Sequence, residues 1–425
     1  MDDPFQSELG QLKARSLHRR LRQMHAAPDG TVELTTAGRL VNFASNDYLG
    51  LADDPILREA AKEAIDRYGV GSGASRLVSG TRAAHTDLEE KLARFKGTEA
   101  ALTFSSGYAA AAGAIGALVD RHDVLILDKL CHACLVDAAR ASGAILRVFP
   151  HNHLGKLEDH LRWARREHPD ARVIVLTEAV FSMDGDRAPL ADMVELKRQH
   201  DALLLVDEAH AVGVIGRNGR GLAAELGVAG QVDIHMGTLS KALGVSGGYL
   251  CGSRSFVELL VNRARSFIYS TAPPPALAAA ASAAIDFLLT DEGERRRLAL
   301  WQNIRLLSSQ LPPAPGLDHT SPSSTLPAVP ADASAKPTPA RTAPASRPAR
   351  KTGGSAIFPW IVGDERDAVD FSSWLAKKGY FCPAIRYPTV AKGTARLRLT
   401  VTARHQPEQI MALGKALDEL TRTVN

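Results

Sequence analysis

A lysine in a stretch of small and hydroxylated residues is the first candidate for chemistry in this sequence. Lys241 lies in Gly237-Thr-Leu-Ser-Lys-Ala-Leu-Gly244, directly after an apolar run. A lysine amine is costly to bury and its pKa shifts readily, and a neutral amine in a tight pocket can form a Schiff base with an aldehyde. A surface lysine in a turn would also fit this octapeptide, so the rest of the chain has to decide.

Acidic and imidazole side chains follow other apolar runs. Asp207 ends one such run, His210 comes three residues later, and His132 follows the run Val124–Asp128. Sites in parallel sheets lie at the carboxyl ends of strands, so we expect these side chains to meet Lys241. A carboxylate could keep a pyridinium nitrogen protonated, and a histidine could bond a phenolic oxygen or stack on a ring, as pyridoxal phosphate requires. Taken singly, a helix-capping aspartate and a structural histidine are the alternatives.

Two loops could hold the phosphate of such a cofactor. Gly107 and Tyr108 lie between a predicted strand and an alanine-rich helix, and Thr238 precedes the lysine in its loop. Backbone N–H groups at a helix N-terminus bind phosphate dianions, and a threonine hydroxyl could add a further donor. Glycine before a helix is common, so this signal is weak by itself.

Short apolar runs alternate with helical patterns from about residue 99 onward. This alternation predicts an α/β fold with a mostly parallel sheet covered by helices on both faces. The expected strands are 101–104, 124–128, 145–149, 173–177, 203–207 and 233–236, and the expected helices are 107–118, 133–141, 157–167 and 190–199.

Composition changes along the chain predict its domain organisation. A basic amphipathic pattern over 8–24 predicts a helix, and a stretch dominated by Pro, Ala, Ser and Thr predicts a disordered or extended linker. The expected units are an N-terminal helical arm (1–45), a large domain (46–290), a connecting helix (291–311), the linker (312–354) and a small α+β domain (355–425).

The overall composition is that of an ordinary globular protein. The 425 residues are 45% hydrophobic and 23% charged, with a net charge of +4. This charge is too small to argue for nucleic acid, no apolar run is long enough for a membrane span, and no secretory signal is visible. Four cysteines do not suggest a disulfide framework in a chain of this length. We therefore expect a cytoplasmic enzyme without membrane or nucleic-acid partners.

Two short motifs suggest other functions and are rejected. Asp207-Glu-Ala-His210 spells a helicase-type motif, but no phosphate-binding loop with its lysine accompanies it. Cys131-His-Ala-Cys134 has the spacing of a zinc or redox site, but no second Cys/His pair lies at ligand spacing. We therefore expect neither ATP hydrolysis nor a metal.

Five ordered motifs together resemble the α-oxoamine synthases, which are pyridoxal phosphate (PLP) enzymes of fold type I, the aspartate aminotransferase-like fold. The resemblance covers roughly residues 8–311 and 355–425, and the linker departs from the family pattern by its length. The motifs are Asn42–Leu51, Gly71–Gly80, Thr177–Asp186, Val206–His210 and Gly237–Gly244.

The resemblance implies a role for each matching residue. Lys241 would carry the cofactor and later remove a proton from the substrate, and Asp207 would pair with the ring nitrogen. It places His132 on the ring face, where it could also meet the substrate. The further cofactor contacts implied are Ser182 and His210 at the phenolic oxygen and Gly107, Tyr108 and Thr238 at the phosphate, and the further substrate contacts are Arg22, Asn46, Thr389 and Arg398.

Within the family, the chain looks most similar to the members that condense L-alanine with a pimeloyl thioester in biotin biosynthesis. Ser182–Leu190, Tyr269–Pro274 and Pro388–Thr402 carry this finer resemblance. The thioester could be the CoA ester or that of a carrier protein. Glycine C-acetyltransferase and 5-aminolevulinate synthase share most cofactor residues and are the alternatives. The resemblance also implies a homodimer in which the Gly71–Gly80 loop and Tyr269–Thr271 contribute to the neighbouring subunit's site.

Overall fold

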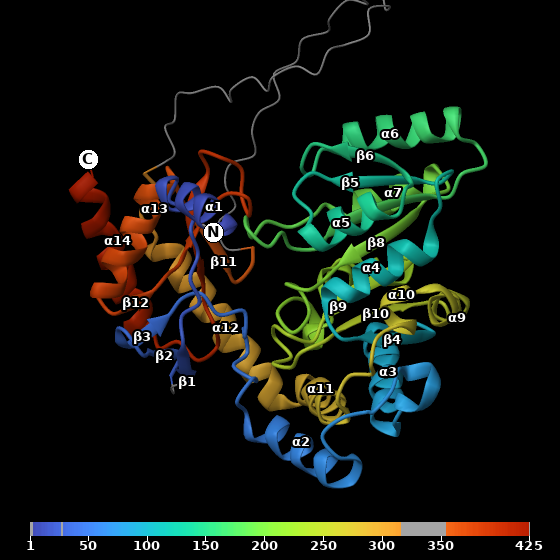
Figure 1. Ribbon diagram of the computed structural model, residues 1–425, viewed down its shortest axis with the longest axis horizontal. Helices are drawn as coiled ribbons and strands as arrows, with labels where there is room; N and C mark the ends of the chain where they lie inside the picture. The colour runs from blue at the N-terminus through green and yellow to red at the C-terminus, as the bar shows by residue number, and fades with distance from the viewer. Residues whose placement is uncertain (1–2, 27–28, 316–353, 425) are drawn as a thin grey trace, which may run out of the picture.

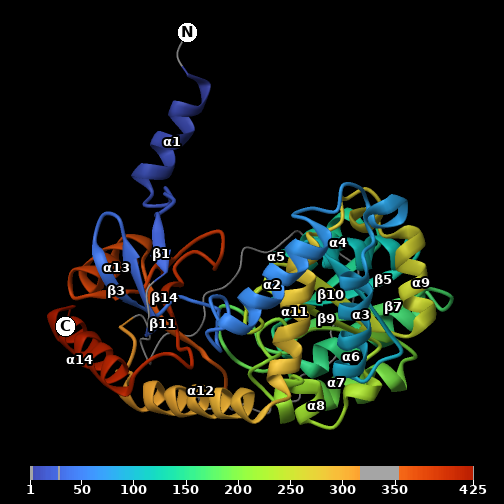
Figure 2. The ribbon, with the colours of Figure 1, turned by 90° about the horizontal axis from the view of Figure 1, so that it is seen from below.

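The computed structural model describes residues 3–26, 29–315 and 354–424. Two bodies are visible in Figure 1: a large body, from α2 (Pro55–Tyr68) to α11 (Pro275–Leu288), and a small body built from both ends of the chain. Helix α12 (Asp291–Gln310) leads from the large body along one side of the small body (Figure 2). Residues 316–353, nearly all of the predicted linker, lie outside the described residues.

A seven-stranded sheet forms the centre of the large body, and its strands are parallel except for β10. This confirms the predicted mostly parallel α/β sheet. Strand β10 was not predicted, because its glycines at both ends resemble a loop. The order across the sheet is β4 (Ala100–Phe104), β10 (Gly248–Gly252), β9 (Ile234–Thr238), β8 (Leu203–Asp207), β7 (Val173–Glu178), β5 (Val124–Asp128) and β6 (Ile145–Phe149).

The sheet separates two apolar cores because side chains alternate along each strand. On β8, Leu205 faces one core, whereas Leu204 and Val206 face the other. Helices cover both faces, so the central strands are apolar throughout. The first core includes α4 (Gly107–Leu118), α5 (Ala133–Ala141) and α9 (Arg254–Arg263), and the second includes α3 (Ala83–Lys96), α6 (Leu154–Glu167), α7 (Leu190–Gln199) and α11.

The small body combines segments from both ends of the chain. Strand β3 (Gly38–Asn42) pairs in parallel with β12 (Tyr380–Phe381), so the N-terminal strands and the C-terminal part share one sheet. The remaining elements are β1 (Met24–Ala26), β2 (Thr31–Leu34), β11 (Ile357–Gly363), β13 (Ala384–Ile385), β14 (Ala395–Thr400), α13 (Glu365–Lys377) and α14 (Pro407–Val424).

The N-terminal arm differs from the prediction of a helix over 8–24 within a helical 1–45. Helix α1 covers Pro4–Ala14 only, and Ser16 has a left-handed φ of 53° just beyond it. The chain then turns toward the small body, where Arg19 donates to the carbonyl of Tyr387 at 2.9 Å and Arg386 donates to the carbonyl of Ser16. These contacts replace the helical backbone bonds that the amphipathic pattern predicted.

No helix within the described ranges is both long enough and apolar enough to cross a membrane.

Candidate active site

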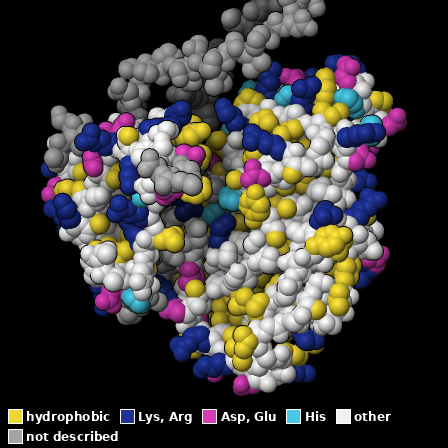
Figure 3. Space-filling view, in the orientation of Figure 1, with side chains coloured by type: hydrophobic (Ala, Val, Ile, Leu, Met, Phe, Trp, Pro, Cys, Tyr) yellow, Lys and Arg dark blue, Asp and Glu magenta, His cyan; other side chains and the backbone are white. Residues whose placement is uncertain are grey.

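A cavity of about 150 Å³ lies at the carboxyl ends of β7, β8 and β9. Figure 3 shows the surface hollowed between the two bodies. Side chains that were expected to meet at this edge of the sheet therefore do line one cavity. Predicted site residues that line the cavity are Gly107, Tyr108, His132, Asp207, His210, Thr238 and Lys241.

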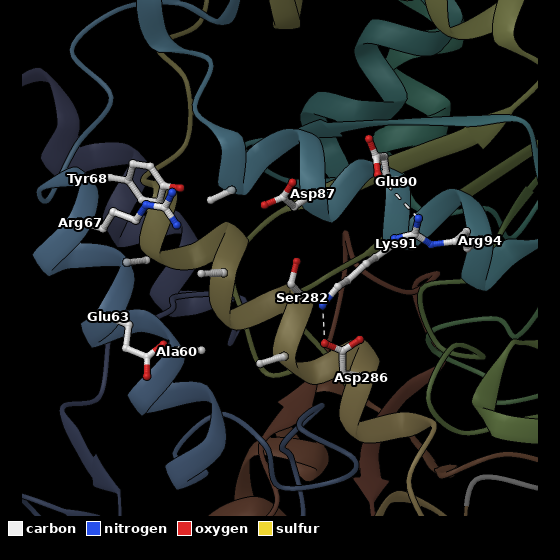
Figure 4. Close-up of a pocket in the computed structure, with 14 residues that line it drawn as sticks. Ala60, Glu63, Arg67, Tyr68, Asp87, Glu90, Lys91, Arg94, Ser282 and Asp286 are labelled. Carbon is white, nitrogen blue, oxygen red and sulfur yellow. Dashed lines mark hydrogen bonds and ion pairs between the residues drawn. The ribbon is translucent and has the colours of Figure 1, made fainter.

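A larger hollow of about 500 Å³ runs along α11 between α2 and α3 (Figure 4). Its charged groups largely satisfy one another, since Lys91 pairs with Asp286 and Arg94 lies 3.6 Å from Glu90. No strand end of the central sheet contributes to it. The smaller cavity is therefore the better candidate for chemistry.

Lys241 is presented by a tight turn after β9. The N–H of Gly244 donates to the carbonyl of Lys241 at 2.9 Å, and the hydroxyl of Thr238 donates to the carbonyl of Gly247 at 2.9 Å. Gly244 has a φ of 69°, and a Cβ there would lie 2.6 Å from the backbone nitrogen of Ala52, so only glycine fits. Burial lowers the pKa of Lys241, against the opposing effect of Asp207. The neutral amine is the nucleophilic form.

Asp207 ends β8 and is a buried carboxylate. Its Oδ1 accepts a hydrogen bond from the N–H of Ala209 at 2.9 Å, and it forms no ion pair with any residue in the described parts of the chain. Burial raises its pKa, and the nearby Lys241 opposes that rise. A cationic N–H placed in the cavity would stabilise the ionised carboxylate, which is what a protonated pyridine ring offers.

Glu178 is a cavity residue that the sequence-based list of site residues omitted. It ends β7 and is buried, and its Oε1 accepts from the backbone N–H of His132. Burial, followed by the charge of Asp207, raises its pKa well above the usual value. Its position at a strand end was the available signal. Glu178 fixes the loop that carries His132 at the cavity wall.

The two cavity histidines are each held by a neighbouring residue. The ring Nδ1 of His132 accepts from the N–H of Cys134 at 3.2 Å, so His132 caps α5. The ring Nδ1 of His210 lies 2.7 Å from the hydroxyl of Tyr48, and burial lowers the pKa of His210 well below its usual value. Both rings are thus oriented by their neighbours, and Tyr48 is a second residue that the sequence-based list omitted.

The N-terminus of α4 faces the cavity and suits a phosphate. Ser106 caps the helix by accepting from the N–H of Ala109 at 3.0 Å, and Gly107 and Tyr108 follow it at the cavity wall. A Cβ on Gly107 would lie 3.9 Å from the hydroxyl oxygen of Thr238, so both residues border the same space. Free N–H groups, the helix dipole and a hydroxyl together favour a dianion at this point.

Arg398 brings the small body to the site. From β14, its Nη1 donates to Oδ1 of Asn46 at 3.1 Å, and its Nε donates to the carbonyl of Ser182. The same Asn46 oxygen accepts from the hydroxyl of Tyr48 at 3.2 Å. Nη2 of Arg398 is buried without a hydrogen-bond partner. A buried guanidinium nitrogen without an acceptor suits a carboxylate ligand.

Of the predicted substrate contacts, only His132 lines the cavity. Asn46 and Arg398 bind each other outside its lining, and the charge of Arg398 acts on Lys241 and His210. The other two predicted contacts lie elsewhere. Arg22 is exposed and lies over the ring of Phe381, with 5.5 Å between the guanidinium carbon and the ring centroid. Thr389 is exposed in the loop between β13 and β14. Neither Arg22 nor Thr389 lines the cavity. Ser182 does not line it either, and its backbone carbonyl accepts a hydrogen bond from Arg398. Their roles stay predictions.

The residues present fit PLP. An amine, an unpaired buried carboxylate, a helix N-terminus and two oriented imidazoles surround one cavity. This fold and site define the chain as a PLP-dependent transferase of fold type I.

The chain belongs to the aminotransferase class I and II family, which it matches over residues 39–335. It is 46% identical to 8-amino-7-oxononanoate synthase of Geobacter sulfurreducens, covering 95% of this chain and 94% of the relative. It is 44% identical to the enzyme of that name from Anaeromyxobacter dehalogenans, covering 97% and 94%.

Solved structures that are similar to this chain include two enzymes of the α-oxoamine synthase family. Serine palmitoyltransferase of Sphingomonas wittichii has a TM-score of 0.83 at 30% identity, covering 99% of this chain and 97% of that one. An 8-amino-7-oxononanoate synthase from Francisella tularensis has a TM-score of 0.69 at 25% identity, covering 91% and 99%. The predicted resemblance to α-oxoamine synthases is confirmed.

Proposed function

We propose that this chain is a PLP-dependent 8-amino-7-oxononanoate synthase, which condenses L-alanine with a pimeloyl thioester and releases the thiol and CO2. The observation that carries the proposal is the 46% identity to a relative of that name over nearly the full length of both chains. The reaction forms a bond between Cα of alanine and the thioester carbonyl carbon and breaks the C–S bond. The alanine carboxylate leaves as CO2, and Cα takes a proton.

Lys241 and Asp207 would do the proton chemistry. PLP, when bound, supplies an electron sink that makes loss of the Cα proton from an amino acid feasible. The lowered pKa of Lys241 favours the neutral form of its Nζ, which is the form that can take this proton. Asp207, buried without a cationic partner among the residues described, would hold a proton on the ring nitrogen. His132 at the cavity wall would orient the acceptor carbonyl.

Arg398 would bind the alanine carboxylate. Its Nη2 is the free donor, while its other nitrogens are held by Asn46 and Ser182, so the guanidinium is positioned before substrate arrives. We propose Arg22 and Thr389 as contacts to the acyl substrate. Arg22 contributes an exposed cation that would suit a carboxylate at the far end of a pimeloyl chain.

An assay of thiol release with a substrate panel tests this function. The purified protein with PLP is given L-alanine, glycine or L-serine, each with pimeloyl-CoA, pimeloyl-carrier protein, acetyl-CoA, succinyl-CoA or palmitoyl-CoA. We expect thiol release and the mass of 8-amino-7-oxononanoate with L-alanine and a pimeloyl thioester. Turnover of another pair with higher kcat/KM would overturn the proposal.

Serine palmitoyl transfer is the second candidate. The TM-scores to serine palmitoyltransferase structures exceed that to the Francisella enzyme, which favours it on backbone shape. Sequence identity of 46% against 29–30% favours the first candidate, and the L-serine and palmitoyl-CoA arm of the panel separates the two.

A homodimer with shared sites is the proposed assembly. Ser75 and Thr271 form an isolated β-bridge that joins the two segments expected to reach the neighbouring subunit. Exposed apolar side chains gather on these segments, including Val78 and Tyr269 at 79% and 72% exposure. Analytical ultracentrifugation would give twice the monomer mass. A cytoplasmic location is also proposed, supported by four buried cysteines that form no disulfide.

A further inference from the structure

His151 lies outside the cavity and bridges two carboxylates. It follows β6 in the chain. Its Nδ1 lies 3.0 Å from Oδ1 of Asp128, and its Nε2 lies 2.7 Å from Oδ2 of Asp186. Asn152 binds the same two carboxylates, through its backbone N–H to Asp128 at 2.8 Å and its side-chain amide to Asp186 at 3.1 Å. The two ring nitrogens can both donate hydrogen bonds to ionised carboxylates only if each nitrogen carries a proton.

Asp128 belongs to the loop that carries His132. It ends β5, and its Oδ1 also accepts from the N–H of Leu130 at 2.8 Å. Its carbonyl accepts from the N–H of Cys131 at 3.1 Å, and the next residue is His132 in the cavity wall. The position of Asp128 therefore determines the path of this loop into the site.

Asp186 belongs to the turn that meets Arg398. The turn is closed by the bridge between Val180 and Arg187, and the N–H of Phe181 donates to the carbonyl of Asp186 at 3.0 Å. The turn carries Ser182, whose carbonyl accepts from Arg398, and Asp184, whose carboxylate lies 2.7 Å from Nη1 of Arg396. Movement of this turn would displace the acceptors of both Arg398 and Arg396.

The environment of His151 keeps it cationic. Its ring meets the edge of Phe181 with 4.3 Å between centroids, which shields one side from water. Burial lowers its pKa, but the hydrogen bonds and charges of Asp128 and Asp186 outweigh this and raise the pKa to about 10. These two carboxylates are the charged groups that act on it from the elements packed around it. At neutral pH the bridge is thus carboxylate–imidazolium–carboxylate.

We propose that His151 is a positioning residue that locks the His132 loop and the Ser182 turn together, so that the cofactor-facing imidazole and the acceptor of Arg398 keep a fixed separation. This rests on the proposed function only for the identity of the substrate that Arg398 receives. A neutral ring could donate to only one of the two carboxylates and would leave the other to Asn152 alone, whereas the cation donates to both.

Hydrogen exchange on the PLP-loaded enzyme tests the proposal without reference to the substrate. His151→Gln removes the charge, His151→Lys keeps it, and His160→Gln at the half-buried His160 of α6 is the matched control. We expect H151Q to speed exchange about tenfold in both segments, 129–132 and 181–187, while H160Q leaves them unchanged. Asp186→Asn should speed exchange mainly in 181–187, because Asp128 keeps its bond to His151.

Kinetics provide the second readout. We expect H151Q to raise the KM for L-alanine about tenfold with a smaller change in kcat, because Arg398 loses its fixed position, and H151K to restore most of the loss. Wild-type exchange in either segment of H151Q would overturn the proposal, as would an H151K enzyme no better than H151Q. If no substrate pair is turned over, the proposed function fails, while the exchange result still decides the role of His151.

Discussion

Two buried clusters of ionisable side chains lie on opposite sides of the end of β8, and the pKa values of their glutamates shift in opposite directions. Asp207 faces the cavity, while the next residue, Glu208, faces the cluster of Lys96 and His235. Lys96 pairs with Glu208 and also donates to the carbonyl of Arg220 at 2.6 Å. The other Glu208 oxygen accepts from the N–H of Ala223 at 3.1 Å. We refer to Lys96, Glu208 and His235 as the paired cluster.

The difference is clearest in two buried glutamates. In the paired cluster, Lys96 and His235 overcome burial and lower the pKa of Glu208 to about 2. At the cavity, burial and the charge of Asp207 raise the pKa of Glu178 well above its usual value, and the nearby Lys241 opposes this rise without reversing it. Removing one member of a buried ion pair destabilises the fold because the other charge is left unpaired, whereas a buried ionisable group without a partner is a candidate for ligand binding. The comparison makes predictions for both clusters.

Lys241→Ala should have the largest effect on activity and almost none on folding. Loss of the nucleophile and base should lower turnover by at least about 10³-fold and abolish the absorbance of lysine-bound cofactor. The free energy of unfolding of the cofactor-free protein should stay within about 1 kcal/mol, because the amine forms no hydrogen bond or ion pair with the part of the chain that the structure describes. Thiol-release assays and urea unfolding measure the two quantities. An active K241A enzyme would contradict the assigned role.

Lys96→Met should have the reverse effect, with a large decrease in the free energy of unfolding and only an indirect effect on the site. It leaves Glu208 buried without its cation, which should cost about 3–5 kcal/mol in urea unfolding. The neighbouring Asp207 and His210 should then bind PLP more weakly, as measured by absorbance titration. Lys241→Met is the matched control for removing a buried lysine. Equal destabilisation by the two methionine substitutions would remove the distinction between the clusters.

The paired cluster should also give stability a specific acid dependence. The pKa of Glu208 in the folded state is about 2, below the ordinary 4.5. Its contribution of about 3 kcal/mol is therefore fully present above pH 4.5 and lost as the pH falls through 2. The gap in unfolding free energy between wild type and Glu208→Gln should narrow by about 2 kcal/mol from pH 6 to pH 3. A constant gap would show that the ion pair does not set this pKa.

Tyr48→Phe should have the smallest effect, and it tests whether the Tyr48 hydroxyl orients His210 at the cavity. The ring is fully buried, so phenylalanine fits, and only the hydroxyl contacts to His210 and Asn46 are lost. We expect a loss of about 1 kcal/mol in stability and a several-fold decrease in kcat, measured by urea unfolding and steady-state kinetics. An unchanged kcat would mean that His210 keeps its orientation without Tyr48.

The residues at strand ends were the most predictable part of the site. Asp207, His210 and Lys241 each follow a short buried strand, and parallel strands bring their carboxyl ends to one edge. Glu178 has the same position and lies in the Thr177–Asp186 motif, but the sequence did not single it out as a site residue. Its importance depends on the contact with the N–H of His132, which strand patterns do not predict.

The small body was less predictable because it is assembled from distant segments. Periodicity describes neighbours in the chain, whereas β3 and β12 pair across the whole length of the large body. The amphipathic pattern over 8–24 likewise gave no hint that Arg19 would bind the carbonyl of Tyr387. The extra strand β10 was missed because a buried glycine-bordered strand and a loop have similar composition.

The pairing of β3 with β12 also has a consequence during synthesis on the ribosome. Strand β3 is made near the start of translation, and its partner at Tyr380–Phe381 emerges only when the chain is almost complete. The large body can fold while translation continues, but the sheet containing β1, β2 and β3 must wait for the final segment. A nascent chain that stops before residue 380 would therefore carry a folded large body with an open sheet edge, a species that chaperones and proteases can recognise.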